Sequence, residues 1–249
     1  MTGTVAVVTG GSRGIGRAYA ERLRELGATV CALDLRPAGD AATEAVAGRG
    51  GFHEYAVDLA DAAATAVVVD EILATRGPID TLVCNAGGGV GEMWQNSPLA
   101  VDMDALRLAF EVNVATMATV CRAVVPQMVD RRRGKVVTVS STAAVKVRPD
   151  GGYAHYASAK AGVIVYTKAL AREVAASGVT ANVLIPGAIG TERLLPKMQA
   201  MGMSRVVAEI PQQRLGTPED CAGVLEFLVT PLSDYVTGAV IAVDGGLTA

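Results

Sequence analysis

The chain has 249 residues, 51% of them hydrophobic and 4% aromatic, and a formal net charge of −3. This length fits one large domain or two small ones, and the weak charge argues against a nucleic-acid-binding protein. The sequence contains neither a signal segment nor an apolar run of about 18 residues, so no membrane span is expected. Four widely spaced cysteines without a CxxC motif and only two histidines argue against a disulfide framework and a metal site. We therefore expect a soluble cytoplasmic protein.

The N-terminal segment follows a strand–turn–helix–strand pattern. Residues 4–9 form a short β-branched run typical of a buried strand, and the glycine-rich segment 10–16 follows at once. A helical pattern covers residues 17–26, and residues 29–34 are predicted as the next strand. Glycines let a backbone approach a pyrophosphate, a helix N-terminus favours its charge, and Asp34 can accept hydrogen bonds from ribose hydroxyls. The segment therefore predicts a dinucleotide site.

The later elements alternate between helix and strand, which is typical of an α/β fold with a parallel sheet. Helices are predicted over residues 37–51, 62–76, 101–132, from Tyr156 to residue 177, and 218–228. Strands are predicted over residues 52–57, 81–84, 135–139, 180–185 and within 235–246. The elements therefore predict about seven strands with helices between them.

Tyr156 and Lys160 lie four residues apart and therefore on one face of a predicted helix. An ammonium beside a phenol favours the phenolate, so Lys160 should lower the pKa of Tyr156 from its ordinary value of about 10. Ser140 and Ser141 follow a predicted strand and could share the same substrate oxygen. Such groups can protonate a carbonyl oxygen while its carbon is attacked. The pair alone favours the simpler interpretation, a surface lysine and a half-buried tyrosine on an ordinary helix, so the catalytic interpretation depends on the rest of the chain.

The glycine spacing from Thr9 to Gly16, Thr-Gly-x-x-x-Gly-x-Gly, resembles that of the classical short-chain dehydrogenase/reductase family. The resemblance extends over essentially the whole chain. It implies a single NAD(P)-binding domain over residues 1–249, built as a Rossmann-type doubly wound parallel sheet with helices on both faces. It also implies a mobile substrate lid at about residues 188–212, and a last strand that pairs subunits into a homotetramer.

The resemblance implies the catalytic set Asn113, Ser141, Tyr156 and Lys160. Ser141 matches the family's serine better than Ser140, and residues 146–152 would form a slightly lengthened loop before Tyr156. Asn113 would hold a water that links Lys160 to solvent. The implied cofactor-binding residues are Gly10, Ser12, Arg13, Gly14, Ile15, Gly16, Asp34, Leu35, Asp58, Leu59, Asn85, Ala86, Gly87, Tyr156, Lys160, Pro186, Gly187, Ile189 and Thr191.

Asp34 and Arg13 bear on the choice between NAD and NADP, and Asp58 has a second possible role. The carboxylate of Asp34 would repel the 2′-phosphate of NADP, which favours NAD. Arg13 is the opposing signal, because a basic residue at that position often accompanies NADP in the family, and Arg36 is a second candidate partner for the phosphate. Asp58 would hold the adenine with Leu59, and it could equally cap the helix over residues 62–76.

Candidate substrate contacts lie in three segments, residues 87–97, 142–153 and 192–210, which are expected to form largely apolar walls. The individual candidates are Trp94, Thr142, Ala143, Tyr153, Leu194 and Met198. Tyr153 is not expected to act as an acid or base, because Ala157 stands where Lys160 would be needed. His155 is expected at the pocket rim or in a subunit interface.

These observations predict an NAD-dependent oxidoreductase that interconverts a medium-sized, mostly apolar secondary alcohol and a ketone by hydride transfer. One alternative is an NADPH-dependent ketoreductase of the same family. A C=C reductase or an epimerase on the same fold is disfavoured, since those families generally alter the Ser–Tyr–Lys set. A non-catalytic NAD(H)-binding partner protein is disfavoured because it would have no reason to keep Ser141, Tyr156 and Lys160 together.

Overall fold

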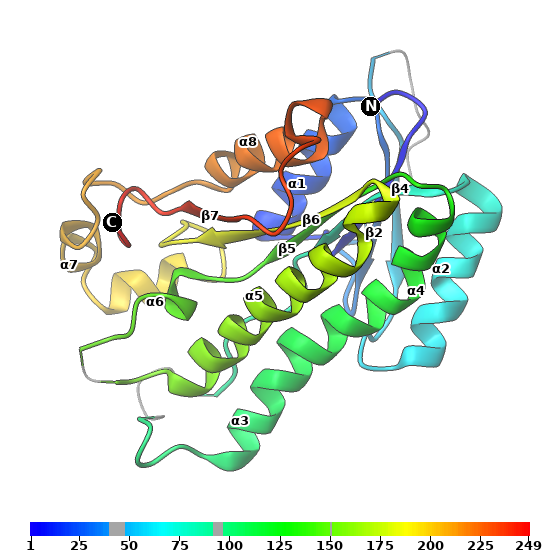
Figure 1. The fold of residues 1–249 in the computed structure, drawn as a ribbon. Helices are drawn as coiled ribbons and strands as arrows, with labels where there is room; N and C mark the ends of the chain where they lie inside the picture. The colour runs from blue at the N-terminus through cyan, green and yellow to red at the C-terminus, as the bar shows by residue number, and fades with distance from the viewer. Residues whose placement is uncertain (40–47, 92–96, 150) are drawn as a thin grey trace.

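The computed structural model describes residues 1–39, 48–91, 97–149 and 151–249. Within these residues a seven-stranded parallel sheet has the order β3-β2-β1-β4-β5-β6-β7 (Figure 1). The strands are β1 (Val5–Thr9), β2 (Thr29–Asp34), β3 (Phe52–Ala56), β4 (Ile79–Cys84), β5 (Gly134–Val139), β6 (Val179–Pro186) and β7 (Val240–Val243). The order reverses direction between β1 and β4, which makes the carboxyl ends of these two strands the expected place for a ligand. The predicted α/β doubly wound fold is confirmed.

Helices cover both faces of the sheet (Figure 1). The helices α1 and α8 lie on one face, and α2, α4 and α5 lie on the other. The α-helices are α1 (Gly14–Glu25), α2 (Ala62–Arg76), α3 (Met103–Phe110), α4 (Thr116–Asp130), α5 (Ala154–Val174), α6 (Leu195–Ala200), α7 (Met203–Ala208) and α8 (Pro218–Val229). Short helical segments are η1 (Glu111–Ala115), η2 (Thr142–Ala144), η3 (Ala175–Ser177) and η4 (Pro231–Ser233).

The core divides into two layers because side chains alternate along each strand. In β1, Val5 and Val7 belong to the layer beneath α2, α4 and α5, whereas Ala6 and Val8 belong to the layer beneath α1 and α8. All five β1 residues are buried, as expected for a strand covered on both faces. The sheet is therefore a rigid platform that fixes the strand ends where the candidate site residues lie.

The predicted helix over residues 101–132 is a continuous helical stretch that contains a π-helical turn, η1, between α3 and α4. By length and composition alone, Met103–Asp130 is apolar enough to cross a membrane, which differs from the expectation of no such segment. In the fold this stretch includes a core helix, since Val120, Val124 and Met128 of α4 are fully buried. The π turn places Asn113 in an irregular segment, and such turns are frequent at functional sites.

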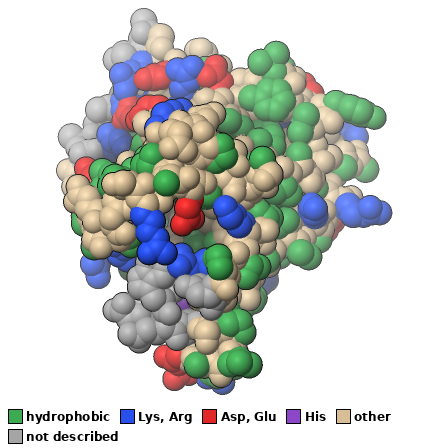
Figure 2. Space-filling model, turned by 90° about the vertical axis from the view of Figure 1, so that its left-hand side faces the viewer, with side chains coloured by type: hydrophobic (Ala, Val, Ile, Leu, Met, Phe, Trp, Pro, Cys, Tyr) green, Lys and Arg blue, Asp and Glu red, His purple; other side chains and the backbone are tan. Residues whose placement is uncertain are grey.

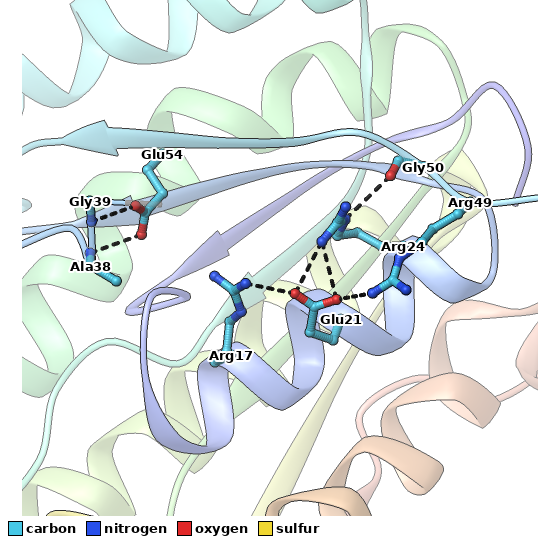
Figure 3. A network of polar contacts seen from close by, with 8 residues as sticks. All are labelled: Arg17, Glu21, Arg24, Ala38, Gly39, Arg49, Gly50 and Glu54. Atoms are coloured by element: carbon cyan, nitrogen blue, oxygen red, sulfur yellow. Dashed lines mark hydrogen bonds and ion pairs between the residues drawn. The ribbon is translucent and has the colours of Figure 1, made fainter. Parts of the chain in front are cut away.

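The predicted helix over residues 37–51 is wrong at both of its described ends. Residues 37–39 and 48–51 are not helical, and residues 40–47 lie outside the described part of the chain. Glu54 of β3 accepts hydrogen bonds from the backbone N–H groups of Ala38 and Gly39, each at 3.0 Å (Figure 3). The backbone groups at the predicted start of the helix are therefore held by a neighbouring strand, a contact that local sequence does not reveal.

Figure 3 also shows an ionic cluster that joins α1 to Arg49, in the segment before β3. Glu21 receives contacts from Arg17 at 2.8 Å, from Arg24 at 3.1 Å, and from Arg49. Partial burial opposes ionisation of Glu21, yet the hydrogen bond from Arg49 and the charges of Arg24 and Arg17 bring its pKa below the ordinary value. The cluster anchors the outer side of α1, the helix that begins at the glycine turn.

Candidate active site

The glycine turn between β1 and α1 has the features that a pyrophosphate requires. Gly14 has a positive φ of 55°. A Cβ atom at Gly16 would overlap the carbonyl oxygen of Gly10 and lie 2.5 Å from Asn85 Nδ2, so the helix packs here as only glycine permits. The start of α1 has no side-chain cap and no acidic residue in its first turn, and its N–H groups therefore favour an anion.

Ser12 gives an independent indication that a polar ligand fits this turn. Among the described residues its buried hydroxyl has no hydrogen-bond partner, and buried polar groups are rarely left without one. Thr191 lies across the turn, with Cγ2 3.7 Å from the position of a Cβ atom at Gly14. The turn and the start of the predicted lid therefore border one space, and the residues present fit a bound dinucleotide.

Two acidic residues predicted to hold the adenosine end lie at the ends of β2 and β3. Asp34 Oδ1 accepts a hydrogen bond from the Arg36 backbone N–H at 3.1 Å, which turns the chain away after β2. Asp58 Oδ1 accepts from the Ala60 N–H at 2.9 Å. The suggestion that Asp58 caps α2 is wrong, because Asp61 is the N-cap and accepts from the first turn. Asp58 is exposed and Leu59 is buried, so an accessible carboxylate lies next to a buried apolar side chain.

Thr9 and Asn85 join the carboxyl ends of β1 and β4 at the reversal point of the sheet. The Thr9 hydroxyl accepts hydrogen bonds at 3.0 Å from the backbone N–H groups of Asn85 and Ala86. The Asn85 side-chain amide donates to the carbonyl oxygens of Thr9 and Gly10, each at 3.2 Å. Thr9 is a positioning residue that the sequence analysis missed, although its place directly before the glycine turn could have suggested it.

The predicted catalytic residues Ser141, Tyr156 and Lys160 gather at the end of β5. The Ser141 hydroxyl lies close enough to the Tyr156 phenol to lower its pKa through hydrogen bonding, against the rise caused by burial. Lys160 is buried, lies 5.9 Å from the centre of the Tyr156 ring, and donates to the Val139 carbonyl oxygen at 2.9 Å. The two candidate serines are now distinguished, because the Ser140 hydroxyl donates to the Lys160 carbonyl oxygen at 2.7 Å. Ser140 thus holds α5 against β5, and Ser141 is the serine that contacts the phenol.

The prediction that the Tyr156 pKa is lowered is wrong, because this pKa is raised above its ordinary value. Burial raises the pKa of this phenol, and the Ser141 hydrogen bond and the charge of Arg193 oppose that rise. The same burial lowers the pKa of Lys160 from 10.5 to about 8, since its ammonium is desolvated. The sequence spacing predicted that the two side chains lie together, but it could not reveal that Lys160 is buried and Tyr156 partly buried.

Replacing Lys160 with Met should remove a pH-dependent part of the stability. The unfolded chain binds the Lys160 proton more tightly than the folded chain, so wild-type stability should rise as the pH increases from about 8 to 10.5. A shift of this size corresponds to about 3 kcal/mol at most. Urea unfolding of both proteins at several pH values from 7.5 to 10.5 tests this, and parallel stability profiles would contradict the burial of a titrating ammonium.

Asn113 anchors the glycine loop that follows β4. Its Oδ1 accepts from the Gly88 N–H at 2.9 Å, and its Nδ2 donates to the carbonyl oxygens of Gly88 at 3.0 Å and Ala109 at 2.8 Å. A Cβ atom at Gly87 would lie 2.5 Å from Asn113 Oδ1, so the loop approaches this amide as closely as glycine allows. The observed role is to position the loop, and the water-holding role stays a prediction.

The nicotinamide-side residues predicted from the sequence follow β6 and lead into the lid. Gly187 N–H donates to the Val243 carbonyl oxygen at 3.0 Å, and Ile189 is buried and bridges to Gly216 in parallel fashion. Thr191 is also buried.

Figure 2 views the molecule from the side of α6, α7 and the C-terminus, and basic side chains border the middle of this face.

The candidate substrate residues divide into four groups. Trp94 lies outside the described residues. Thr142 is buried, and the Ala143 N–H donates to Ser141 Oγ at 3.2 Å. Both residues belong to η2, the short helical segment that Ser141 caps. The lid residues Leu194 and Met198 form one helical turn, with the Met198 side chain buried. Tyr153 lies beside Tyr156.

His155 is not at the pocket rim or on the surface. Its side chain is fully buried, and Nε2 lies 2.8 Å from the Val90 carbonyl oxygen. The difference arises because the loop after β4 folds over the start of α5, a tertiary contact that the sequence pattern does not reveal. Arg193, a polar residue of the predicted wall 192–210, also contacts this loop, since its guanidinium donates to the Gly89 carbonyl oxygen at 3.1 Å.

Comparisons with known proteins agree with this geometry. A family model described as enoyl-(acyl carrier protein) reductase matches residues 10–248. Cyclohexanol dehydrogenase of Rhodococcus sp. (strain TK6) is 44% identical over 262 residues, which cover 100% of this chain and 97% of that protein. The 3-oxoacyl-[acyl-carrier-protein] reductase FabG of Escherichia coli (strain K12) is 36% identical over 247 residues, covering 98% of this chain and 97% of that protein. The crystal structure of a 3-oxoacyl-[acyl-carrier protein] reductase with bound NAD from Brucella melitensis is similar with a TM-score of 0.86 and 32% identity, covering 100% of this chain and 92% of that one.

Proposed function

Since this chain belongs to the classical short-chain dehydrogenase/reductase family, we propose that Ser141, Tyr156 and Lys160 are the residues with which it interconverts a secondary alcohol and a ketone. The protein is an oxidoreductase that acts on the CH–OH group. The observation that carries the proposal is the contact of Ser141 with Tyr156 beside the buried Lys160. These groups converge where a substrate oxygen can meet a proton donor and a second hydrogen-bond donor.

Each residue has a distinct task in this proposal. Tyr156 removes the proton from the alcohol oxygen during oxidation and returns it to the carbonyl oxygen during reduction. Ser141 hydrogen-bonds the same oxygen and fixes its distance from the phenol. Lys160, when charged, stabilises the phenolate that forms, and Asn113 keeps the adjoining loop in place. The nicotinamide, when bound, supplies or accepts the hydride.

We propose NAD as the cofactor, held by the glycine turn, Ser12 and Asp34. The bare N-terminus of α1 and the partnerless Ser12 hydroxyl suit the pyrophosphate, and the Asp34 carboxylate suits two ribose hydroxyls. The same carboxylate would face the 2′-phosphate of NADP. Arg13 and Arg36 are exposed, so each can turn towards solvent and neither needs to neutralise Asp34.

Replacing Asp34 with Ala should reduce the preference for NAD over NADP by at least about tenfold in kcat/KM, equivalent to about 1.4 kcal/mol. The substitution removes a repulsive charge for NADP and a hydrogen-bond acceptor for NAD. Initial rates with both cofactors, measured by reduced-nicotinamide absorbance, test this. A wild-type enzyme that is faster with NADP(H) would contradict the cofactor assignment and favour the NADPH-dependent ketoreductase.

One substrate panel separates the candidate functions. Secondary alcohols, ketones and compounds with an activated C=C bond are each supplied with NAD(H) and, in parallel, with NADP(H). Alcohol oxidation and ketone reduction are expected, with no turnover of the C=C compounds. Turnover confined to the C=C compounds would support the C=C reductase, and NADH binding without any turnover would support a non-catalytic partner protein.

A homotetramer and a cytoplasmic location complete the proposal. The strand β7 is at the edge of the sheet and its residues are partly exposed, so it is available for contact with a second subunit. Near it, Leu232 and Tyr235 are exposed apolar side chains. Size-exclusion chromatography with light scattering tests the tetramer, and a monomer would contradict it.

A further inference from the structure

Tyr153 has a backbone conformation that its residue type does not favour. It precedes α5 with φ 68° and ψ 22°, in the left-handed region, which is uncommon for a bulky side chain. It sits at the N-cap position but makes no capping hydrogen bond, whereas short polar residues in extended conformation are usual there. Capping therefore does not account for Tyr153, and strained residues of this kind cluster at functional sites.

The ring of Tyr153 lies directly on the ring of Tyr156. The two ring centres are 4.6 Å apart and the planes are inclined by 26°, so the rings are stacked. Tyr153 keeps part of its surface accessible. The Tyr153 ring therefore covers one face of the Tyr156 ring.

The hydroxyl end of Tyr153 is fixed by Gly89. A Cβ atom at Gly89 would overlap the Tyr153 hydroxyl and lie 2.7 Å from its Cζ. Gly89 is not among the glycines with positive φ, and the three atoms nearest to an added Cβ all belong to Tyr153. The absence of a side chain at Gly89 is therefore what lets the Tyr153 ring lie where it does.

Other contacts hold the Gly89 segment firmly. Asn113 binds Gly88 on one side, His155 contacts the Val90 carbonyl oxygen on the other, and Arg193 donates to the Gly89 carbonyl oxygen. Tyr153 also makes an edge contact with the His155 ring, with centres 5.2 Å apart. The loop, the lid and the start of α5 thus fix one position for the Tyr153 ring.

We propose that Tyr153, seated against Gly89, is the specificity-determining residue that limits the site to compact secondary alcohols and ketones. This inference rests on the proposed function of Tyr156. A single ring or a short chain on the reacting carbon fits beside the stacked tyrosines, and a fused or branched neighbour collides with the Tyr153 ring.

The first test compares Tyr153→Asn with Tyr153→Phe. Asparagine accepts the left-handed conformation and removes the ring, whereas phenylalanine keeps the ring and loses only the hydroxyl. With cyclohexanol as the compact substrate and 2-decalol as the fused one, Tyr153→Asn should raise the kcat/KM ratio of decalol to cyclohexanol at least about tenfold, and Tyr153→Phe should leave it within about twofold. An unchanged ratio in a folded Tyr153→Asn enzyme would overturn the proposal.

The second test exploits the glycine. Gly89→Ala should displace the Tyr153 ring and raise the same ratio, although it adds an atom to the site. In the double variant with Tyr153→Asn, the alanine should have no further effect, because the two substitutions act through one contact. Additive effects would overturn the link between Gly89 and Tyr153.

The outcomes separate this inference from the proposed function. If the wild type turns over only compounds with an activated C=C bond, the proposed reaction fails, and the size ratio is measured with a compact and a fused member of that class. An altered ratio in Tyr153→Asn then still supports the size limit, and an unaltered ratio overturns it. A wild type without turnover of any panel member overturns both.

Discussion

Tyr156→Phe should lower kcat by about a thousandfold, within the range of about 10² to 10⁴ expected for loss of a general acid or base. Phenylalanine keeps the ring that stacks on Tyr153 and lies near Lys160, and it removes only the oxygen that contacts Ser141. NADH affinity should therefore stay within a few fold of the wild-type value. Steady-state kinetics and NADH fluorescence titration measure the two quantities separately.

Tyr153→Phe is the matched control for this prediction, because it removes a hydroxyl from the neighbouring ring of the same stack. Burial also raises the pKa of Tyr153, and its residue four positions later is Ala157, so it has no ammonium one helical turn away. The control should keep kcat within about fivefold of wild type, far less than the loss expected at Tyr156. Equal losses in the two variants would show that the stack, and not the Tyr156 proton, sustains the reaction.

Short-range signals were sufficient for most of the fold. The predicted bounds of β2 and α2 coincide with those of the structure, because Gly27 precedes the strand and Asp61 and Gly77 flank the helix. The described ends of the segment 37–51 were predicted wrongly for the opposite reason. Its alanines favour a helix, but Glu54 on the adjacent strand holds the backbone N–H groups of Ala38 and Gly39. Contacts between segments overrule local propensity there.

The sequence predicts which side chains meet in the site, but it does not predict how far each of them is buried. The spacing of Tyr156 and Lys160 and the strand before Ser141 were enough to bring the three side chains together. Neither spacing nor motif indicates that burial raises the pKa of Tyr156 and lowers that of Lys160, since burial depends on tertiary packing around α5. For the same reason His155 was predicted at the pocket rim or in a subunit interface and is fully buried beneath Val90.

Gly16→Ala should lower both the stability of the protein and its affinity for NADH, and the same substitution at a second glycine provides the control. The added Cβ would overlap the Gly10 carbonyl oxygen and press on Asn85 Nδ2, so the glycine turn must move away from α1. Overpacking of this kind costs about 1–3 kcal/mol of stability, and displacement of the turn should weaken NADH binding at least about tenfold.

Gly223 lies in α8 and nothing stands within 4 Å of a Cβ atom added there. Gly223→Ala should therefore stabilise the protein by about 0.5–1 kcal/mol, the ordinary gain of alanine over glycine in a helix, with unchanged NADH affinity. Urea unfolding and NADH titration of both variants make the comparison. If Gly16→Ala behaved like Gly223→Ala, the close packing of α1 on the turn would not be what shapes the cofactor site. The opposite signs of two identical substitutions would show that the site depends on backbone approach at Gly16 and not on helix propensity.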